Sequence, residues 1–82
     1  MENMDIDFDV EELLFELKGS GSKSTIPLAL LSKRMDMSKH RVLKLIYKAR
    51  KQIFEYGLLI VQANSGGFYL KRFSLESESE NE

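Results

Sequence analysis

Cysteine is absent from this 82-residue sequence, proline and histidine occur once each, and long apolar runs are missing. Without cysteine the chain can form neither a disulfide framework nor a zinc site built on thiolates, which fits a reducing compartment. No apolar run approaches the ~20 residues that span a bilayer, and the N-terminus is acidic where a secretory signal is basic. We therefore expect a single-domain cytoplasmic protein without a membrane segment.

Residues that carry catalysis are also scarce. The single histidine, His40, lies between Lys39 and Arg41 and has no neighbouring carboxylate to orient it. A catalytic site would need a nucleophile beside a base, or paired carboxylates, whereas the acidic residues cluster towards the two ends of the chain. No segment has the pattern of a calcium loop. The sequence therefore predicts a protein that is not an enzyme and has no metal or cofactor site.

Charge is distributed unevenly along the chain, although the net charge is only −1. Residues 1–17 contain seven acidic and no basic side chains, and residues 76–82 contain four acidic and no basic ones. All twelve Lys and Arg lie between Lys18 and Arg72, where only Asp36 and Glu55 oppose them, so this middle part has a net charge of +10. A compact region with such a charge attracts polyanions, which the overall isoelectric point hides.

The first half of the chain predicts two helices. Residues 9–18 have Asp9 as an N-terminal cap and an apolar stripe at helical spacing, formed by Val10, Leu13, Leu14 and Leu17. Glycine and serine at 19–22 end this helix. Thr25–Ile26 is typical of a short strand, and Pro27 fits the first turn of a second helix at 26–34.

A turn at 35–37 precedes a third, longer helix at 38–56, with Ser38 as its N-terminal cap. Its core-facing stripe is formed by Val42, Leu45, Ile46, Ala49, Ile53 and Tyr56. Gly57 ends the helix because glycine readily adopts the left-handed conformation of a helix C-terminus.

Two β-prone runs follow at 58–62 and 68–73, and the turn formers at 63–67 between them predict a β-hairpin. The whole is predicted to be a small α+β winged helix-turn-helix fold, with three helices and a hairpin wing. We expect an acidic N-terminal segment at 1–8, the domain at 9–73 and an acidic, disordered tail at 74–82.

The stretch from Ile26 to Arg72 resembles the winged helix-turn-helix domain at the N-terminus of the biotin repressor and of many sugar-responsive bacterial repressors. The matching features are an apolar pair in helix two, a turn followed by serine, a basic third helix, a glycine and a wing that closes on Gly-Tyr-x-Leu. Here these are Leu30–Leu31, Met37–Ser38, residues 39–56, Gly57 and residues 66–70, with Phe68 where tyrosine is usual. The resemblance implies DNA binding and regulation of transcription.

DNA binding requires cations that meet phosphates and polar groups that meet base edges, both on an element that fits the major groove. The predicted reading face of the third helix lies opposite its core stripe and comprises Ser38, Lys39, His40, Leu43, Lys44, Tyr47 and Lys48. Base-edge contacts are expected from Lys39, His40, Leu43 and Lys44, and phosphate contacts from Arg41, Lys48 and Lys51. The alternative is that this basic helix is merely solvated.

In the wing, Asn64 and Ser65 at the tip and Lys71 and Arg72 at the base are candidates for contact with the DNA backbone or minor groove. Gly66–Gly67 is explained by the turn, since a hairpin turn needs positive φ angles. Two basic residues at the end of the second helix, Lys33 and Arg34, either contact phosphate or complement the helix dipole.

Strand alternation places Leu58, Ile60, Phe68 and Leu70 towards the core, so three apolar side chains point outward: Leu59, Val61 and Tyr69. Such a face indicates a homodimer or partner contact, unless Phe73, or Ile6 with Phe8, folds over it.

We therefore predict a double-stranded DNA-binding protein, a small transcriptional regulator that inserts helix 38–56 into the major groove, with a dimer as the usual arrangement. Two alternatives remain open. One is a recombination or replication accessory protein, and the other is a protein-interaction module that binds a polymerase or another regulator. The acidic flanks either solubilise the chain, compete with DNA for the basic face or bind a basic protein surface.

Overall fold

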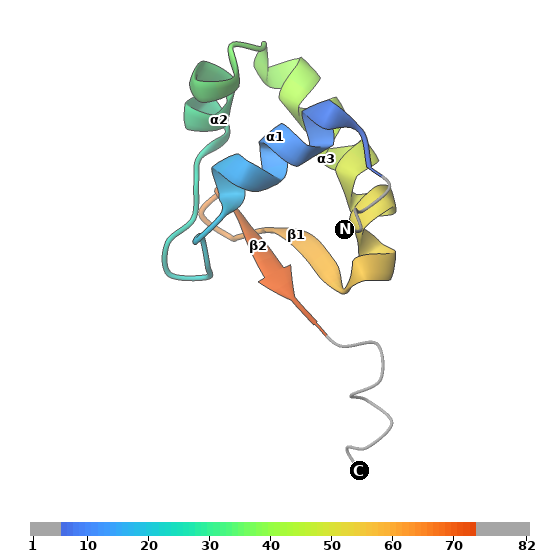
Figure 1. Cartoon of the computed structure of the whole chain (residues 1–82). Helices are drawn as coiled ribbons and strands as arrows, with labels where there is room; N and C mark the ends of the chain where they lie inside the picture. The colour runs from blue at the N-terminus through green and yellow to red at the C-terminus, as the bar shows by residue number, and fades with distance from the viewer. Residues whose placement is uncertain (1–5, 74–82) are drawn as a thin grey trace.

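The structure, a computed structural model, describes residues 6–73. Three helices, α1 (Phe8–Leu17), α2 (Leu28–Met35) and α3 (Lys39–Ile53), precede a short 3-10 turn (Phe54–Tyr56) and two strands, β1 (Leu58–Gln62) and β2 (Phe68–Arg72). α1 crosses α3, α2 lies beside the start of α3, and the hairpin lies below the helices (Figure 1). This small α+β fold has the layout of a winged helix-turn-helix domain, as the sequence predicted.

One hydrophobic core holds the elements together. It contains side chains from every helix and both strands: Val10, Leu13, Leu17, Leu31, Val42, Leu45, Ile46, Ala49, Ile53, Ile60 and Phe68. These residues include the predicted apolar stripes of α1 and α3, so the helical periodicity identified the buried faces correctly. Each large aliphatic side chain that leaves water contributes roughly 1.5–3 kcal/mol, which explains why so short a chain folds around these few positions.

α1 starts earlier than the sequence indicated. The helix begins at Phe8 with Asp7 at the N-cap position, and the side chain of Asp7 makes no capping hydrogen bond. The prediction that Asp9 caps the helix is therefore wrong, since Asp9 lies within the first turn. Ile6 packs against the core ahead of the helix, which extends the folded region towards the N-terminus. Residues 1–5 and the predicted tail at 74–82 lie outside the described residues.

The link between α2 and α3 forms the helix-turn-helix. Pro27 takes the N-cap position of α2 instead of its predicted place within the first turn. Asp36 has a left-handed conformation with φ of 56°, and the Met37 amide donates to the carbonyl of Ser32 at 3.1 Å. The Ser32 hydroxyl also donates to the carbonyl of Met37. This closed turn fixes where α3 begins relative to α2.

α3 is α-helical only to Ile53, and a 3-10 turn completes the predicted span to residue 56. The tighter turn rotates the last residues out of the phase of the helix. As a consequence Tyr56, which was expected in the core stripe, is 37 % exposed. Gly57 adopts φ of 77°, the predicted left-handed helix end.

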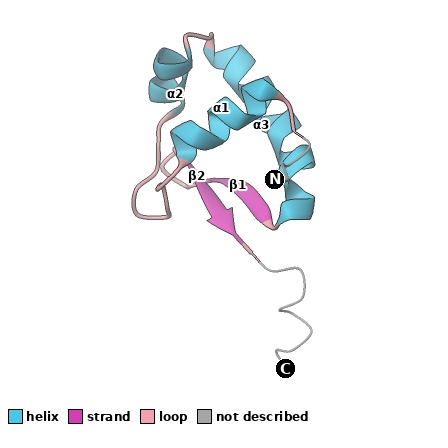
Figure 2. Cartoon of the chain, in the orientation of Figure 1, coloured by secondary structure: helices cyan, strands magenta, loops and turns pink. Residues whose placement is uncertain are grey.

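The hairpin pairs β1 and β2 antiparallel, with Ile60 opposite Leu70 and Val61 opposite Tyr69. Figure 2 shows it as the only pair of strand arrows in the described chain. The expected short strand around Thr25–Ile26 is reduced to one bridge, in which Ile26 exchanges two backbone hydrogen bonds of 2.8 Å with Phe68. This bridge ties the wing to the start of α2. Within residues 6–73, no helix has the length and apolar character needed to cross a bilayer.

Candidate nucleic-acid interface

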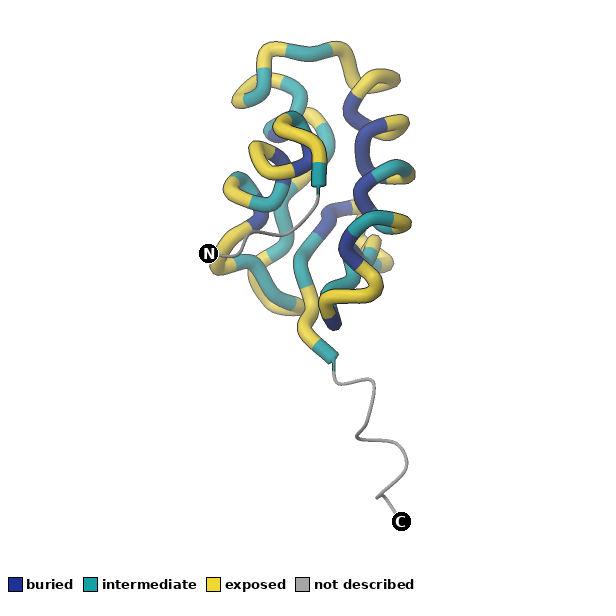
Figure 3. The backbone as a smooth tube through the Cα atoms, turned by 45° about the vertical axis from the view of Figure 1, so that its right-hand side comes forward, coloured by how far each residue is buried: buried dark blue, intermediate teal, exposed yellow. Residues whose placement is uncertain are grey.

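α3 is anchored at its start and along one side. The Ser38 hydroxyl accepts a hydrogen bond of 3.2 Å from the Arg41 amide, as a capping serine does. Its buried residues lie on one side of the helix, and exposed positions form the opposite side (Figure 3). The N-terminal cap and the buried stripe therefore fix the position of α3, so that its opposite side faces solvent.

The outward side of α3 brings together several predicted site residues. Positions 40, 44, 47 and 51 lie opposite the core stripe at helical spacing, and Leu43 flanks them. Tyr47 is 66 % exposed and Leu43 is 44 % exposed, which is high for large apolar side chains. The Lys51 ammonium lies 5.9 Å from the centre of the Tyr47 ring, a cation–π distance. We call the set His40, Leu43, Lys44, Tyr47 and Lys51 the α3 outer face.

The cations of this region differ in whether acidic side chains neutralise them. Lys39, Arg41, Lys44 and Lys51 are exposed and have no carboxylate partner among residues 6–73. Since no carboxylate of residues 6–73 neutralises these four charges, the described part of the chain leaves them available to an external anion.

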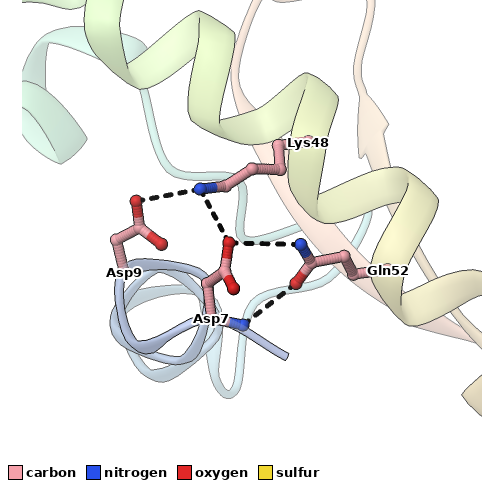
Figure 4. Close-up of polar contacts among 4 residues, drawn as sticks. All are labelled: Asp7, Asp9, Lys48 and Gln52. Carbon is pink, nitrogen blue, oxygen red and sulfur yellow. Dashed lines mark hydrogen bonds and ion pairs between the residues drawn. The ribbon is translucent and has the colours of Figure 1, made fainter. Parts of the chain in front are cut away.

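Lys48 is placed differently from its neighbours. Its ammonium lies 3.0 Å from a carboxylate oxygen of Asp7 and 3.2 Å from one of Asp9 (Figure 4). Gln52 completes the cluster, because its side-chain nitrogen donates to Asp7 at 3.3 Å and its oxygen accepts from the Asp7 amide at 3.0 Å. We call these four residues the acidic clamp. Sequence reasoning assigned Lys48 to phosphate contact and missed its partners, which lie about 40 residues away in the chain.

The contacts within the acidic clamp shift the pKa values of Asp7 and Lys48. The hydrogen bond from Lys48, with the one from Gln52, lowers the pKa of the Asp7 carboxyl. The hydrogen bonds to Asp7 and Asp9 raise the pKa of Lys48. Both shifts favour the charged forms, so the clamp is an ion pair at neutral pH.

A shallow hollow lies where α3 faces α1. It is lined by Asp9, Met37, Arg41, Lys44, Leu45 and Lys48. The carboxylate of Asp9 opposes the basic side chains there, so this flank of α3 is electrostatically mixed. Of the α3 outer face, only Lys44 lines this hollow, and His40, Leu43, Tyr47 and Lys51 lie away from it.

The wing carries its predicted residues at two separate ends. Asn64 and Ser65 are exposed at the tip, whereas Lys71 and Arg72 are exposed at the base, opposite Leu59 and Leu58. The wing tip therefore has polar groups but no charge, and the cations of the hairpin lie near the end of α3.

Two side chains that the sequence did not single out fix the wing. The Arg50 guanidinium donates from Nε to the carbonyl of Ile60 at 3.0 Å, which joins α3 to β1. The Ser20 hydroxyl accepts from the Leu70 amide at 3.0 Å, which joins the loop after α1 to β2. No local sequence pattern predicts either hydrogen bond, because Arg50 and Ser20 each bind a backbone group that only folding brings close.

The outward hairpin residues Leu59, Val61 and Tyr69 are half-buried and do not pack on the core. Val61 and Tyr69 face each other across the strands and border a hollow with Ser22 and the wing tip. Among the residues expected to cover them, Phe73 instead has its ring 5.1 Å from that of Phe54, and Ile6 packs on the core. Phe8 is 73 % exposed on α1. A dimer or partner contact at this face stays a prediction.

The two basic residues at the end of α2 have different surroundings. Arg34 lies 3.6 Å from the Glu16 carboxylate of α1, and both residues of the pair, Lys33 and Arg34, lie in the last helical turn. Arg34 therefore links α2 to α1, whereas Lys33 is exposed without a carboxylate partner in the described chain.

Comparisons of the chain with known protein families, curated proteins and solved structures gave no match.

Proposed function

We propose that the chain binds double-stranded DNA by placing the α3 outer face in the major groove, as a small transcriptional regulator would. The observation that carries the proposal is a set of exposed cations on a capped helix, next to a hairpin, that no carboxylate of residues 6–73 neutralises. A helix of this diameter fits the major groove, and lysine or arginine side chains on it meet phosphates and guanine edges.

Residues on this face and beside it on α3 have different expected roles. Lys39, His40, Leu43 and Lys44 lie on the first two turns of α3, the end of the helix that enters the groove in helix-turn-helix proteins. Arg41 and Lys51 are assigned to phosphates. Lys48 is no longer assigned to phosphate, because Asp7 and Asp9 already neutralise it.

The wing supports the same orientation. Asn64 and Ser65 offer polar groups at the tip for the backbone or minor groove, and Lys71 and Arg72 add cations at its base. The Arg50 bond ties the wing to α3, and the Ser20 bond ties it to the loop after α1. A wing fixed in this way supports the proposal that both elements contact one duplex.

Fluorescence anisotropy with a mixed-sequence duplex at low and physiological salt tests the proposal. Log affinity is expected to fall with log salt by about 0.9 for each phosphate contact. Lys44→Ala/Lys51→Ala is expected to weaken binding and, because Lys51 is assigned to phosphate and Lys44 to a base edge, to reduce this slope by about one phosphate contact. The matched control is Lys48→Ala, one helical turn from Lys44, which is expected to change affinity and slope little.

Two results would contradict the proposal. Wild-type protein that does not bind at low salt would remove DNA as the ligand of the isolated chain. A Lys48→Ala variant that is weakened as much as the double variant would show that α3 does not read DNA through its outer face.

A further inference from the structure

The solvent side of α1 exposes two phenylalanines. Phe8 is 73 % and Phe15 is 69 % exposed, and the two lie seven residues apart, opposite the buried Val10, Leu13 and Leu17. At this spacing the two rings lie in line along two turns of one helix face, which makes this face a candidate for a contact with another surface. Glu11 and Glu12 are exposed between them.

The acidic residues of α1 are not equivalent. Asp7 and Asp9 pair with Lys48, and Glu16 pairs with Arg34. Glu11 and Glu12, by contrast, have no cationic partner among residues 6–73. We call Phe8, Glu11, Glu12 and Phe15 the α1 outer face. A surface that covers it must bring apolar groups for the rings and cations for the two carboxylates.

This requirement excludes symmetric pairing of α1 with α1 of another copy. A two-fold contact would place the same patch on both sides and would bring Glu11 and Glu12 against their own copies. Like charges brought together in this way oppose association.

The α3 outer face has the complementary chemistry. It presents Lys44 and Lys51 with the exposed apolar groups of Leu43 and Tyr47 between and beside them. Lys44 and Lys51 are seven residues apart, as Phe8 and Phe15 are, so both faces repeat over about 10.5 Å. Both helices bury their opposite sides in the same core, so within one chain these two faces point away from each other.

We propose that the α1 outer face of one copy docks on the α3 outer face of a second copy. Such a head-to-tail contact leaves one α1 face and one α3 face free at the ends, so it permits longer assemblies. Two single helix faces make a small interface, and we expect association in the range of roughly 10 µM to 1 mM. A further consequence rests on the proposed function: DNA and self-association compete for the α3 outer face.

Sedimentation velocity on the full chain tests the contact. We expect the sedimentation coefficient of the wild type to rise with concentration at ~50 mM salt and to fall back to that of a monomer at ~500 mM salt. Phe8→Ser/Phe15→Ser is expected to stay monomeric, with its fold checked by circular dichroism. A wild type that is monomeric up to ~1 mM, or a serine variant that associates equally, overturns the proposal.

A charge exchange identifies the two faces. Glu11→Lys/Glu12→Lys and Lys44→Glu/Lys51→Glu are each expected to be monomeric alone, and to associate when mixed because complementary faces are restored. Adding Phe8→Ser/Phe15→Ser to both variants controls for general attraction between oppositely charged proteins and is expected to abolish the mixed association, because neither copy then has an intact α1 outer face. A mixture that stays monomeric, or one that is insensitive to the serine substitutions, overturns the contact.

DNA binding is measured separately, so that the two proposals fail separately. Phe8→Ser/Phe15→Ser leaves α3 intact and is expected to bind duplex in dilute solution as the wild type does. Added duplex is expected to dissociate the wild-type assemblies. If every copy in the assemblies binds duplex while the assemblies remain intact, the α3 outer face is not shared and the docking proposal is wrong. If no duplex binds to the monomer, only the proposed function fails.

Discussion

Lys48 lies with its ammonium 3.0 Å from the carboxylate of Asp7, and this contact joins the start of α1 to the middle of the basic helix α3. Asp9 adds a second carboxylate at 3.2 Å. An acidic segment of the chain thus neutralises one cation of the helix that we propose as the DNA-binding element. If the acidic flank competes with DNA for the basic helix, the contacts of Asp7 and Asp9 with Lys48 are where that competition takes place.

Removal of the two carboxylate charges of the acidic clamp is expected to strengthen DNA binding. Asp7→Asn/Asp9→Asn frees the Lys48 ammonium and removes two negative charges that would repel phosphates. We expect affinity to rise about three- to tenfold in anisotropy measurements and the salt dependence to steepen by about one contact, ~0.9. Glu11→Gln/Glu12→Gln removes the same charge from the opposite side of α1. An equal gain from this control would show a general charge effect instead of a release of Lys48.

The Asp7 carboxyl is expected to titrate below its ordinary value of 3.8, because Lys48 and Gln52 donate to its charged form. This lowered pKa means that the contact stabilises the fold above the pKa of an unfolded Asp, and that the contribution is lost as the pH falls through the lower folded-state value. Carboxyl-carbon NMR measures the titration directly. Lys48→Met is expected to raise the midpoint, whereas Lys44→Met is not, and an unshifted midpoint in the wild type would contradict the ion pair.

Arg50→Met is expected to destabilise the domain by about 1–3 kcal/mol in urea unfolding, because it removes a charged donor from the carbonyl of the buried Ile60. The Met side chain keeps most of the apolar stem, so the loss reports the hydrogen bond. Lys51→Met, on the solvent side of the same helix, is the control and is expected to change stability by less than ~0.5 kcal/mol. Equal effects from both substitutions would mean that Arg50 does not anchor the wing.

Gly57→Ala is expected to cost more than Gly19→Ala, although both glycines have positive φ, of 77° and 82°. The left-handed conformation alone costs a non-glycine residue roughly 1–2 kcal/mol. At Gly57 an added Cβ would also lie 2.7 Å from the Phe73 carbonyl oxygen, whereas Gly19 has open space. The difference in unfolding free energy between the two variants therefore measures the cost of the steric clash between the added Cβ at position 57 and the Phe73 carbonyl oxygen. Equal values would show that the chain at Phe73 moves aside freely.

Several features of the fold were predictable because they depend on neighbours in the sequence. The stripes of α1 and α3 follow helical periodicity, the Ser38 hydroxyl caps α3 by accepting from the Arg41 amide three residues later, and Gly57 supplies the left-handed conformation that ends the helical region. The placement of cations on α3 opposite its buried stripe follows from the same periodicity. Helix ends were less accurate, as at Asp9 and Tyr56, because Ile6 packs on the core and the last turn tightens into 3-10 geometry.

The sequence by itself thus determined the element order, the buried faces and the basic character of α3, because local hydrogen bonding, φ preferences and apolar spacing act over a few residues. Only the tertiary structure decided which cations of residues 6–73 meet an acidic side chain or a carbonyl of that same part of the chain. Lys48 meets Asp7 and Asp9, and Arg50 meets the carbonyl of Ile60, because packing of α1 and β1 on α3 brings those groups within hydrogen-bonding distance. Such partners are set by the three-dimensional crossing of elements, and no local pattern in the chain encodes them.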